Sequence, residues 1–198
     1  NKEELQLSEK ITNFLCEKLV RKKIRKQFGG NLQAFVSGGG ALDRNIGEFL
    51  NAVGLPTLQG YGLTEASPVV SCNLPNLVKV DSVGPPFRTN KVKIAEDGEI
   101  LIKGENVMLG YWNLKEETEK VIKDGWLHTG DIGEFDNNNY LKITDRKKDI
   151  IVNLGGDNIS PSKVENILCL NENIKQSFVY GDKKNYLVAL IVSEKEIN

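Results

Sequence analysis

The sequence contains Thr57-Leu58-Gln59-Gly60-Tyr61-Gly62-Leu63-Thr64-Glu65, in which a short strand is expected to run into a turn with two glycines. Upstream, the apolar residues 32–36 predict another strand, which ends at Ser37-Gly38-Gly39-Gly40. Residues 43–54 between them predict a helix. Strand, helix and strand form a βαβ unit with parallel strands and a right-handed connection. Both glycine turns then lie at the carboxyl ends of strands, the edge where open α/β sheets bind ligands.

The helix between the two strands has its own start and stop signals. Asp43 can cap its first turn, and Gly54 can end it. We expect four apolar side chains to face inward: Ile46, Phe49, Leu50 and Val53.

Residues 3–28 predict a long amphipathic helix, which Gly29 and Gly30 stop. Its last turns are basic, through Lys18, Arg21, Lys22, Lys23, Arg25 and Lys26. Cations near a helix C-terminus complement its dipole, so a solvated face is the plain interpretation. Peripheral contact with an anionic membrane or another polyanion is the alternative.

Residues 76–144 predict a small antiparallel β unit, barrel-like in type. One hairpin turns at Asp97-Gly98 and a second at residues 136–139, and Asn113 is expected to cap a short helix that ends near Ile122. Residues 145–149 form a charge run that we interpret as a hinge. Beyond it, residues 150–198 predict part of an α+β domain, with a helix opened by Ser160 and strands near residues 178–180 and 187–192. The predicted division is therefore 1–75 (end of an α/β subdomain), 76–144, 145–149 and 150–198.

Composition limits the function classes. A formal net charge of -1 over 198 residues gives no global attraction to nucleic acid. No apolar run approaches the about 20 residues that span a bilayer. Three scattered cysteines fit reduced cytosolic thiols. His128 is the only histidine, so we expect a structural, hydrogen-bonded side chain there and no His-based metal site. The chain begins with Asn1, and we suspect that it starts inside a longer protein.

The glycine turns do not match standard phosphate loops. A GxGxxG motif starting at Gly38 would need glycine where Asp43 stands, and no GxxxxGK[ST] occurs. The second turn is more informative, because Tyr61 offers a flat surface for a base, Thr64 a hydroxyl for phosphate and Glu65 a carboxylate for Mg²⁺. Taken alone, this segment fits an ordinary loop as well as a nucleotide site.

Five ordered segments resemble motifs of the adenylate-forming superfamily of acyl-CoA synthetases, luciferases and peptide-synthetase adenylation domains. Gln59 to Ser67 resembles its adenine-and-phosphate motif. The other similar segments are Ser37 to Ala41, Gly98 to Trp112, Gly125 to Asp131 with Thr144 to Asp149, and Gly155 to Glu165. The resemblance extends over nearly the whole chain.

The resemblance implies a role for each matching residue. The first glycine turn (Gly38, Gly39, Gly40) would line the adenine and acyl pockets, and Gln59, Gly60 and Gly62 would belong to the nucleotide site. Tyr61 would stack on adenine, Thr64 contact phosphate and Glu65 hold Mg²⁺. Asp131 and Arg146 would bind the ribose. Lys148 would be the hinge, and Gly155 and Gly156 would line the coenzyme A channel.

The implied activity is ATP-dependent activation of a carboxylic acid through an acyl-adenylate, followed by transfer to coenzyme A. Residues 32–42 and 147–159 look most like long-chain fatty acyl-CoA synthetases, which makes a fatty acid, ATP and coenzyme A the expected partners. We expect a cytoplasmic protein, with the inner face of a membrane as the alternative. Adenylation of an amino or aryl acid for a carrier protein, and a non-catalytic nucleotide-binding module, remain competing interpretations.

Two parts of the family pattern have no match in the chain. These are the Ser/Thr/Gly-rich phosphate loop and the late adenylation lysine, since Lys195 does not sit in that motif. We therefore expect residues 1–198 alone to be inactive, although a longer parent would be active.

Overall fold

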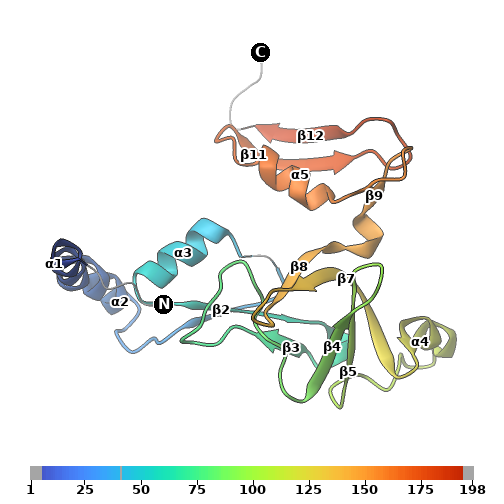
Figure 1. Ribbon diagram of the computed structural model, residues 1–198, viewed down its shortest axis with the longest axis horizontal. Helices are drawn as coiled ribbons and strands as arrows, with labels where there is room; N and C mark the ends of the chain where they lie inside the picture. Colours follow the sequence, from blue (N-terminus) through green and yellow to red (C-terminus); the bar gives the residue numbers. More distant parts are fainter. Residues whose placement is uncertain (1–5, 41, 194–198) are drawn as a thin grey trace.

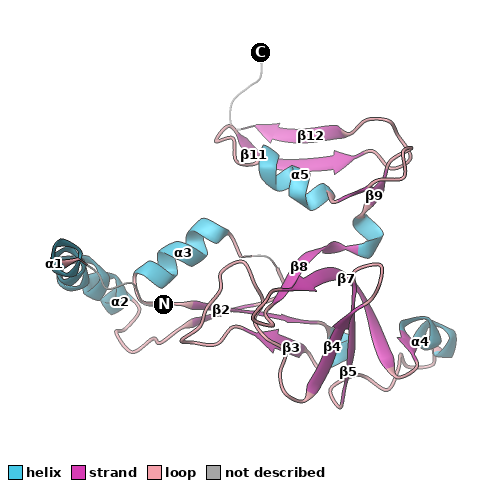
Figure 2. Ribbon diagram, in the orientation of Figure 1, coloured by secondary structure: helices cyan, strands magenta, loops and turns pink. Residues whose placement is uncertain are grey.

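The computed structural model describes residues 6–40 and 42–193. Figure 1 shows an N-terminal helix, a central part with two sheets and a C-terminal unit joined by a short connector. The secondary structure is mixed α and β, with few helices and a curled antiparallel sheet (Figure 2). This confirms the predicted fold class: an α/β part, an antiparallel β part and an α+β part. The proposed subdomain boundaries stay predictions.

The N-terminal helix is continuous but not uniform. α1 (Leu7–Cys16) passes into a π-helical turn, η1 (Glu17–Arg21), and then into α2 (Lys22–Gln27). Gly29 and Gly30 have φ of 80° and 78° and end it as predicted; residues 3–5 lie outside the described part. The apolar side chains of the helix are largely exposed: Leu7, Ile11, Phe14, Leu15, Leu19 and Val20.

The predicted βαβ unit is present. β1 (Phe35–Ser37) and β2 (Thr57–Gly62) pair in parallel, with α3 (Arg44–Ala52) between them in the chain. β1 is shorter than the predicted strand because it begins at Phe35. A third strand that the pattern did not predict, β3 (Val69–Cys72), pairs antiparallel with β2.

α3 begins and ends where its signals predict, but its buried face differs from the prediction. Asp43 accepts a hydrogen bond from the amide of Ile46 at 3.0 Å, and Gly54 follows the helix with φ of 79°. Ile46 and Phe49 are 54% and 56% exposed, so the expectation that they face inward is wrong. The reason is Gly47, which is buried and whose added Cβ would lie 2.6 Å from a Val80 methyl.

Five antiparallel strands form the second sheet, in the order β4-β5-β7-β6 with β8 also paired to β7. Their bounds are Asn90–Ile94 (β4), Glu99–Gly104 (β5), Ile122–Lys123 (β6), Trp126–Phe135 (β7) and Leu141–Arg146 (β8). Both predicted hairpins are confirmed. The helix α4 (Lys115–Val121) starts after Leu114, so the predicted cap by Asn113, which has φ of 54°, is wrong.

One hydrophobic cluster joins the two sheets. Its buried members are Tyr61, Ala66, Val70, Val83, Ile100, Ile102, Leu127 and Leu141. The chain segment between β3 and β4 is hydrogen-bonded to both sheets, because the amide of Phe87 donates to the carbonyl of Val70 on β3 and the amide of Val83 donates to the carbonyl of Leu141 on β8. The end of β2, where Tyr61 lies, is therefore held against the antiparallel sheet.

The C-terminal unit follows a connector, η3 (Lys147–Asp149). The five residues of the predicted hinge therefore belong to two elements: residues 145 and 146 end β8, and residues 147–149 form η3. Two hairpins frame a helix in this unit: β9 (Ile151–Val152) with β10 (Asn158–Ile159), then α5 (Pro161–Leu168), then β11 (Ile174–Tyr180) with β12 (Val188–Ser193). Ser160 caps α5 as predicted, accepting from the amide of Lys163 at 3.2 Å.

Candidate functional site

Three predicted site residues meet at the junction of the two sheets. The hydroxyl of Tyr61, on β2, donates to Oδ2 of Asp131 at 2.6 Å. Nε of Arg146, on β8, lies 2.9 Å from Oδ1 of the same carboxylate. The two oxygens of Asp131 are therefore each bound by a different strand, and residues 61, 131 and 146 form one cluster.

The pairing of β7 with β8 explains why Asp131 lies next to Arg146. Asp131 and Arg146 are direct partners in the β7–β8 ladder. The register shifts one step later, between Ile132 and Gly133. Thr129 fixes the backbone of β7 just before Asp131. Its hydroxyl donates to the carbonyl of Ile100 at 2.8 Å and accepts from the amide of Asp131 at 3.1 Å. Such irregularities in a ladder re-aim side chains.

Burial gives this cluster a low-dielectric setting. Tyr61 is 9% and Asp131 4% exposed, whereas the Arg146 side chain is 58% exposed. Burial, followed by the hydrogen bond to Asp131, raises the pKa of Tyr61 well above its usual range, so its hydroxyl stays protonated. A buried carboxylate with two donors is well placed to accept further hydroxyl donors from a ligand.

Glu65 forms a second polar contact beside the cluster. Its Oε1 accepts from the hydroxyl of Tyr111 at 2.7 Å, and its backbone carbonyl accepts from the amide of Met108 at 2.8 Å. The hydrogen bond to Glu65 raises the pKa of Tyr111. Oε2 of Glu65 has no hydrogen bond or ion pair within residues 6–40 and 42–193.

The residues present fit a magnesium ion that is held mainly by a nucleotide and only partly by the protein. Among the described residues, no group of three or more His, Cys, Asp or Glu side chains is placed to hold a metal. Mg²⁺ bound with a nucleotide usually takes one or two carboxylates and completes its shell with phosphate and water oxygens. Glu65, half-buried with one carboxylate oxygen unused, suits that arrangement.

The two glycine turns lie side by side, as predicted. Ser37 pairs with Gln59, and a Cβ added to Gly38 would lie 3.9 Å from the carbonyl oxygen of Gly60. A Cβ at Gly39 or Gly40 would meet nothing within 4 Å, so that turn is open. Ala41, which the sequence motif included, lies outside the described residues.

The glycines of β2 serve the sheet itself. A Cβ at Gly62 would lie 1.8 Å from the carbonyl oxygen of Pro68, and one at Gly60 would lie 3.1 Å from that of Ser71. Gln59 is buried, with its carbonyl accepting from the amide of Asn73 at 3.0 Å. These predicted site residues therefore have a packing role that the motif does not reveal.

Thr64 is exposed at the start of η2 (Thr64–Ala66), next to Glu65. The remaining predicted residues, Lys148, Gly155 and Gly156, lie on or beyond the connector. All three are exposed, and no hydrogen bond or ion pair within the described ranges joins them to Asp131. Gly156, with φ of 87°, occupies the turn between β9 and β10.

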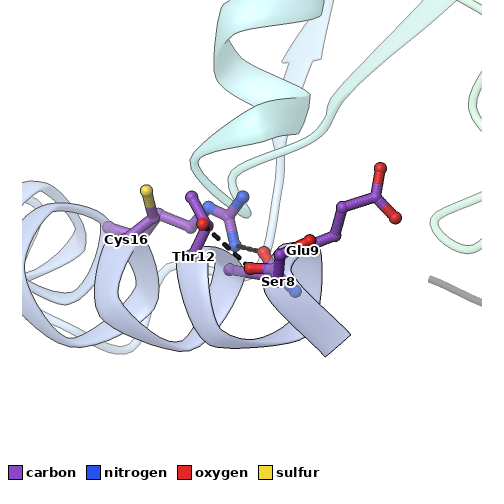
Figure 3. A pocket seen from close by; sticks show the side chains of 6 residues that line it. Ser8, Glu9, Thr12 and Cys16 are labelled. Atoms are coloured by element: carbon purple, nitrogen blue, oxygen red, sulfur yellow. Dashed lines mark hydrogen bonds between the residues drawn. The ribbon is translucent and has the colours of Figure 1, made fainter. Parts of the chain in front are cut away.

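Sequence reasoning missed two polar partners. Tyr111 and Glu99 both lie in the segment from Gly98 to Trp112, which resembles a family motif, but neither was assigned a role in the site. His128 is hydrogen-bonded as expected, with Nδ1 3.2 Å from Oε2 of Glu99. A pocket on α1 shares no residue with the predicted site; Figure 3 shows its lining, which includes Ser8, Thr12 and Cys16.

Comparisons with known proteins agree with this arrangement. The model of the AMP-binding enzyme family matches residues 9–112, more than half of the chain, and that of the AMP-binding enzyme C-terminal domain matches residues 148–198. Long-chain-fatty-acid--CoA ligase FadD15 of Mycobacterium bovis is 42% identical over 180 residues, covering 91% of this chain and 30% of that protein. Long-chain-fatty-acid--CoA ligase 5 of Rattus norvegicus is 36% identical, covering 93% of this chain and 29% of its own length.

Solved structures are similar as well. O-succinylbenzoate CoA synthetase (MenE) of Bacillus subtilis, in complex with its acyl-adenylate intermediate, superposes with a TM-score of 0.76 at 29% identity, covering 89% of this chain and 41% of that one. A Mycobacterium tuberculosis fatty acyl CoA synthetase gives 0.61 at 28% identity, over 88% and 39% of the two chains. The chain spans about 30% of the length of the curated relatives it matches. It belongs to the AMP-binding enzyme family.

Proposed function

We propose that the protein containing these residues activates a long-chain fatty acid with ATP and transfers the acyl group to coenzyme A, releasing AMP and pyrophosphate. The observation that carries the proposal is the Tyr61–Asp131–Arg146 cluster at the carboxyl end of β2. Relatives named long-chain-fatty-acid--CoA ligase, at 35–42% identity, support the substrate class.

In the first step, the carboxylate of the fatty acid attacks the α-phosphorus of ATP, and pyrophosphate leaves. Asp131 would accept hydrogen bonds from the ribose hydroxyls, with Arg146 beside it as a cation. Little ring surface of Tyr61 is exposed, so its contact with adenine would be through one edge or face only. Thr64 would donate its hydroxyl to a phosphate oxygen, where negative charge develops in the transition state.

Glu65 would be the protein ligand of Mg²⁺, which neutralises phosphate charge when bound. Tyr111 holds one oxygen of that carboxylate and so fixes its direction. In this proposal the open turn of Gly38, Gly39 and Gly40 leaves space for the adenine ring and the acyl group.

In the second step, the thiol of coenzyme A attacks the acyl carbon and AMP leaves. The thiol needs a different approach, which a domain rotation can supply. We assign the pivot to Lys148 and the coenzyme A channel to the turn with Gly155 and Gly156, because all three are exposed on or beyond the connector. That residues 1–198 alone do not form an adenylate stays a prediction.

ATP–pyrophosphate exchange by the full protein tests the proposal, with carboxylic acids of graded chain length. Exchange should peak with long-chain fatty acids and fall in Asp131→Asn. A peak with aryl or amino acids would remove the fatty-acid assignment while keeping adenylation. Absence of exchange with every acid, together with AMP binding, would leave a non-catalytic nucleotide-binding module.

A further inference from the structure

Lys147 is the first residue of the connector η3, and its ammonium group is held by the antiparallel sheet. Nζ lies 2.6 Å from Oδ2 of Asp97 and 2.9 Å from Oε2 of Glu99. The two carboxylates flank the Gly98 turn between β4 and β5. One side chain therefore ties the start of the connector to a hairpin about fifty residues earlier in the chain.

Glu99 is a firm attachment point. It is 4% exposed, and its Oε1 accepts from the amide of Gly130 at 2.9 Å, while His128 approaches Oε2. Burial alone would raise the pKa of Glu99, but the hydrogen bonds from Lys147, the Gly130 amide and His128 lower it below its ordinary value. A buried carboxylate needs such partners, and removing one leaves an uncompensated charge.

The next residue behaves differently. Lys148 is exposed and has no ion pair or hydrogen bond among the residues that the structure describes. Two adjacent lysines thus have opposite roles in the connector: the side chain of residue 147 is attached to the sheet, and that of residue 148 is unattached.

We propose that Lys147 is a positioning residue that anchors the connector, so that the C-terminal unit rotates only from Lys148 onward. The inference rests on the proposed function, which supplies Lys148 as the pivot. A hinge that absorbs its dihedral change at one or two residues gives two defined orientations. If the anchor to Asp97 and Glu99 were lost, residue 147 would join the free segment, which would then begin directly after β8, and the C-terminal unit would sample more orientations.

Pulsed electron paramagnetic resonance on the full protein tests this directly. One nitroxide is placed on the exposed Cys169 and the other on Asn138→Cys in the β7–β8 turn, in a background where every other cysteine of the full protein, Cys16 and Cys72 included, is replaced by Ser. Lys147→Met should replace a narrow distance distribution with a broad one. Lys147→Arg, which keeps the cation, should restore the narrow distribution.

Lys142→Met is the matched control, because Lys142 lies on β8 and pairs with Asp81 at 2.6 Å. It should leave the distribution narrow. Asp97→Asn, which removes only the exposed partner of Lys147, should broaden the distance distribution partially. This variant takes the place of Lys147→Met in the test if Lys147→Met does not fold.

An unchanged distribution in folded Lys147→Met, or equal broadening in Lys142→Met, would overturn the anchor. The measurement uses no ATP, fatty acid or coenzyme A, so its failure is distinct from failure of the proposed function. As an activity readout, Lys147→Met should slow thioester formation more than ATP–pyrophosphate exchange. Equal slowing of both half-reactions counts against the anchor.

Discussion

The antiparallel sheet and the N-terminal helix carry similar apolar side chains, but they bury them to very different extents. Ile100, Ile102 and Leu127 are at most 1% exposed, whereas Leu7 and Phe14 are 76% and 65% exposed. The helix has apolar residues at helical spacing, and β5 has a continuous apolar run from Ile100 to Ile102. The comparison teaches that an apolar pattern predicts an element, while burial requires a second surface for that element to meet.

The same contrast applies to glycines. Gly84, between the two sheets, has φ of 80°, and its added Cβ would lie 2.0 Å from the carbonyl carbon of Cys72. A Cβ added to Gly40, in the open turn, would have nothing within 4 Å. The backbone is therefore closely packed around Gly84 and open around Gly40.

The largest expected effect follows from this contrast. Gly84→Ala should lower the free energy of unfolding by more than about 4 kcal/mol or prevent folding, because the new methyl group collides with backbone. Gly40→Ala should stay within about 0.5 kcal/mol. Urea unfolding followed by circular dichroism measures both. A urea midpoint for Gly84→Ala equal to that of the unsubstituted protein would show that the sheets are not in such close contact.

The second prediction compares apolar side chains. Leu127→Ala should cost about 2–5 kcal/mol of unfolding free energy, as expected for a buried leucine. Phe14→Ala should cost at most about 0.5 kcal/mol in this chain, because its ring is mostly exposed. The same urea titration measures the unfolding free energy of both variants. If Phe14→Ala costs as much as Leu127→Ala, the helix face is packed in solution and the comparison between the regions fails.

The third prediction concerns the site at the sheet junction. Asp131→Asn should weaken AMP binding by the full protein by about 10- to 100-fold, because hydrogen bonds to a charged group are worth about 1.5–3 kcal/mol. Isothermal titration calorimetry measures the affinity. Asp136→Asn, in the turn of the same hairpin, removes a carboxylate that pairs with Lys79 and should leave AMP binding unchanged. Equal losses in both variants would assign the effect to the hairpin as a whole.

The smallest expected effect is a pH dependence. The pKa of Glu99 is lowered in the folded protein. Its contribution to stability is therefore fully present above its unfolded-state pKa of about 4.3 and is lost as pH falls through the lower folded-state pKa. The stability difference between the parent and Glu99→Gln should narrow as pH falls through this window. A difference that is constant with pH would mean that the Glu99 charge does not stabilise the fold.

Much of the fold could be predicted from local signals. The βαβ unit follows from two apolar strands that end in glycines, and both β hairpins follow from their turn residues. Asp43 and Ser160 cap helices as expected, because capping depends on neighbours in the chain. The errors at Ile46 and Phe49 arose because the packing surface of α3 is centred on Gly47, a residue that hydrophobic periodicity does not count.

The candidate site was predicted in part. Motif resemblance named Tyr61, Asp131 and Arg146, which the structure brings together. The contact of Tyr111 with Glu65 joins residues 46 positions apart, and no local pattern encodes such a distance. The partners of Glu99 are also remote in the chain: His128 and Gly130 come from β7, which pairs with β5, and Lys147 comes from the connector η3.

Tyr61 belongs at once to the hydrophobic cluster and to the polar cluster, with its ring among residues such as Ile100 and its hydroxyl on Asp131. A substitution at this position therefore has two separate costs. A smaller side chain leaves a void between the sheets, and a phenylalanine leaves a buried carboxylate one donor short. If the proposed function holds, one residue serves both the protein interior and the nucleotide site, so replacing Tyr61 should lower stability and nucleotide affinity together.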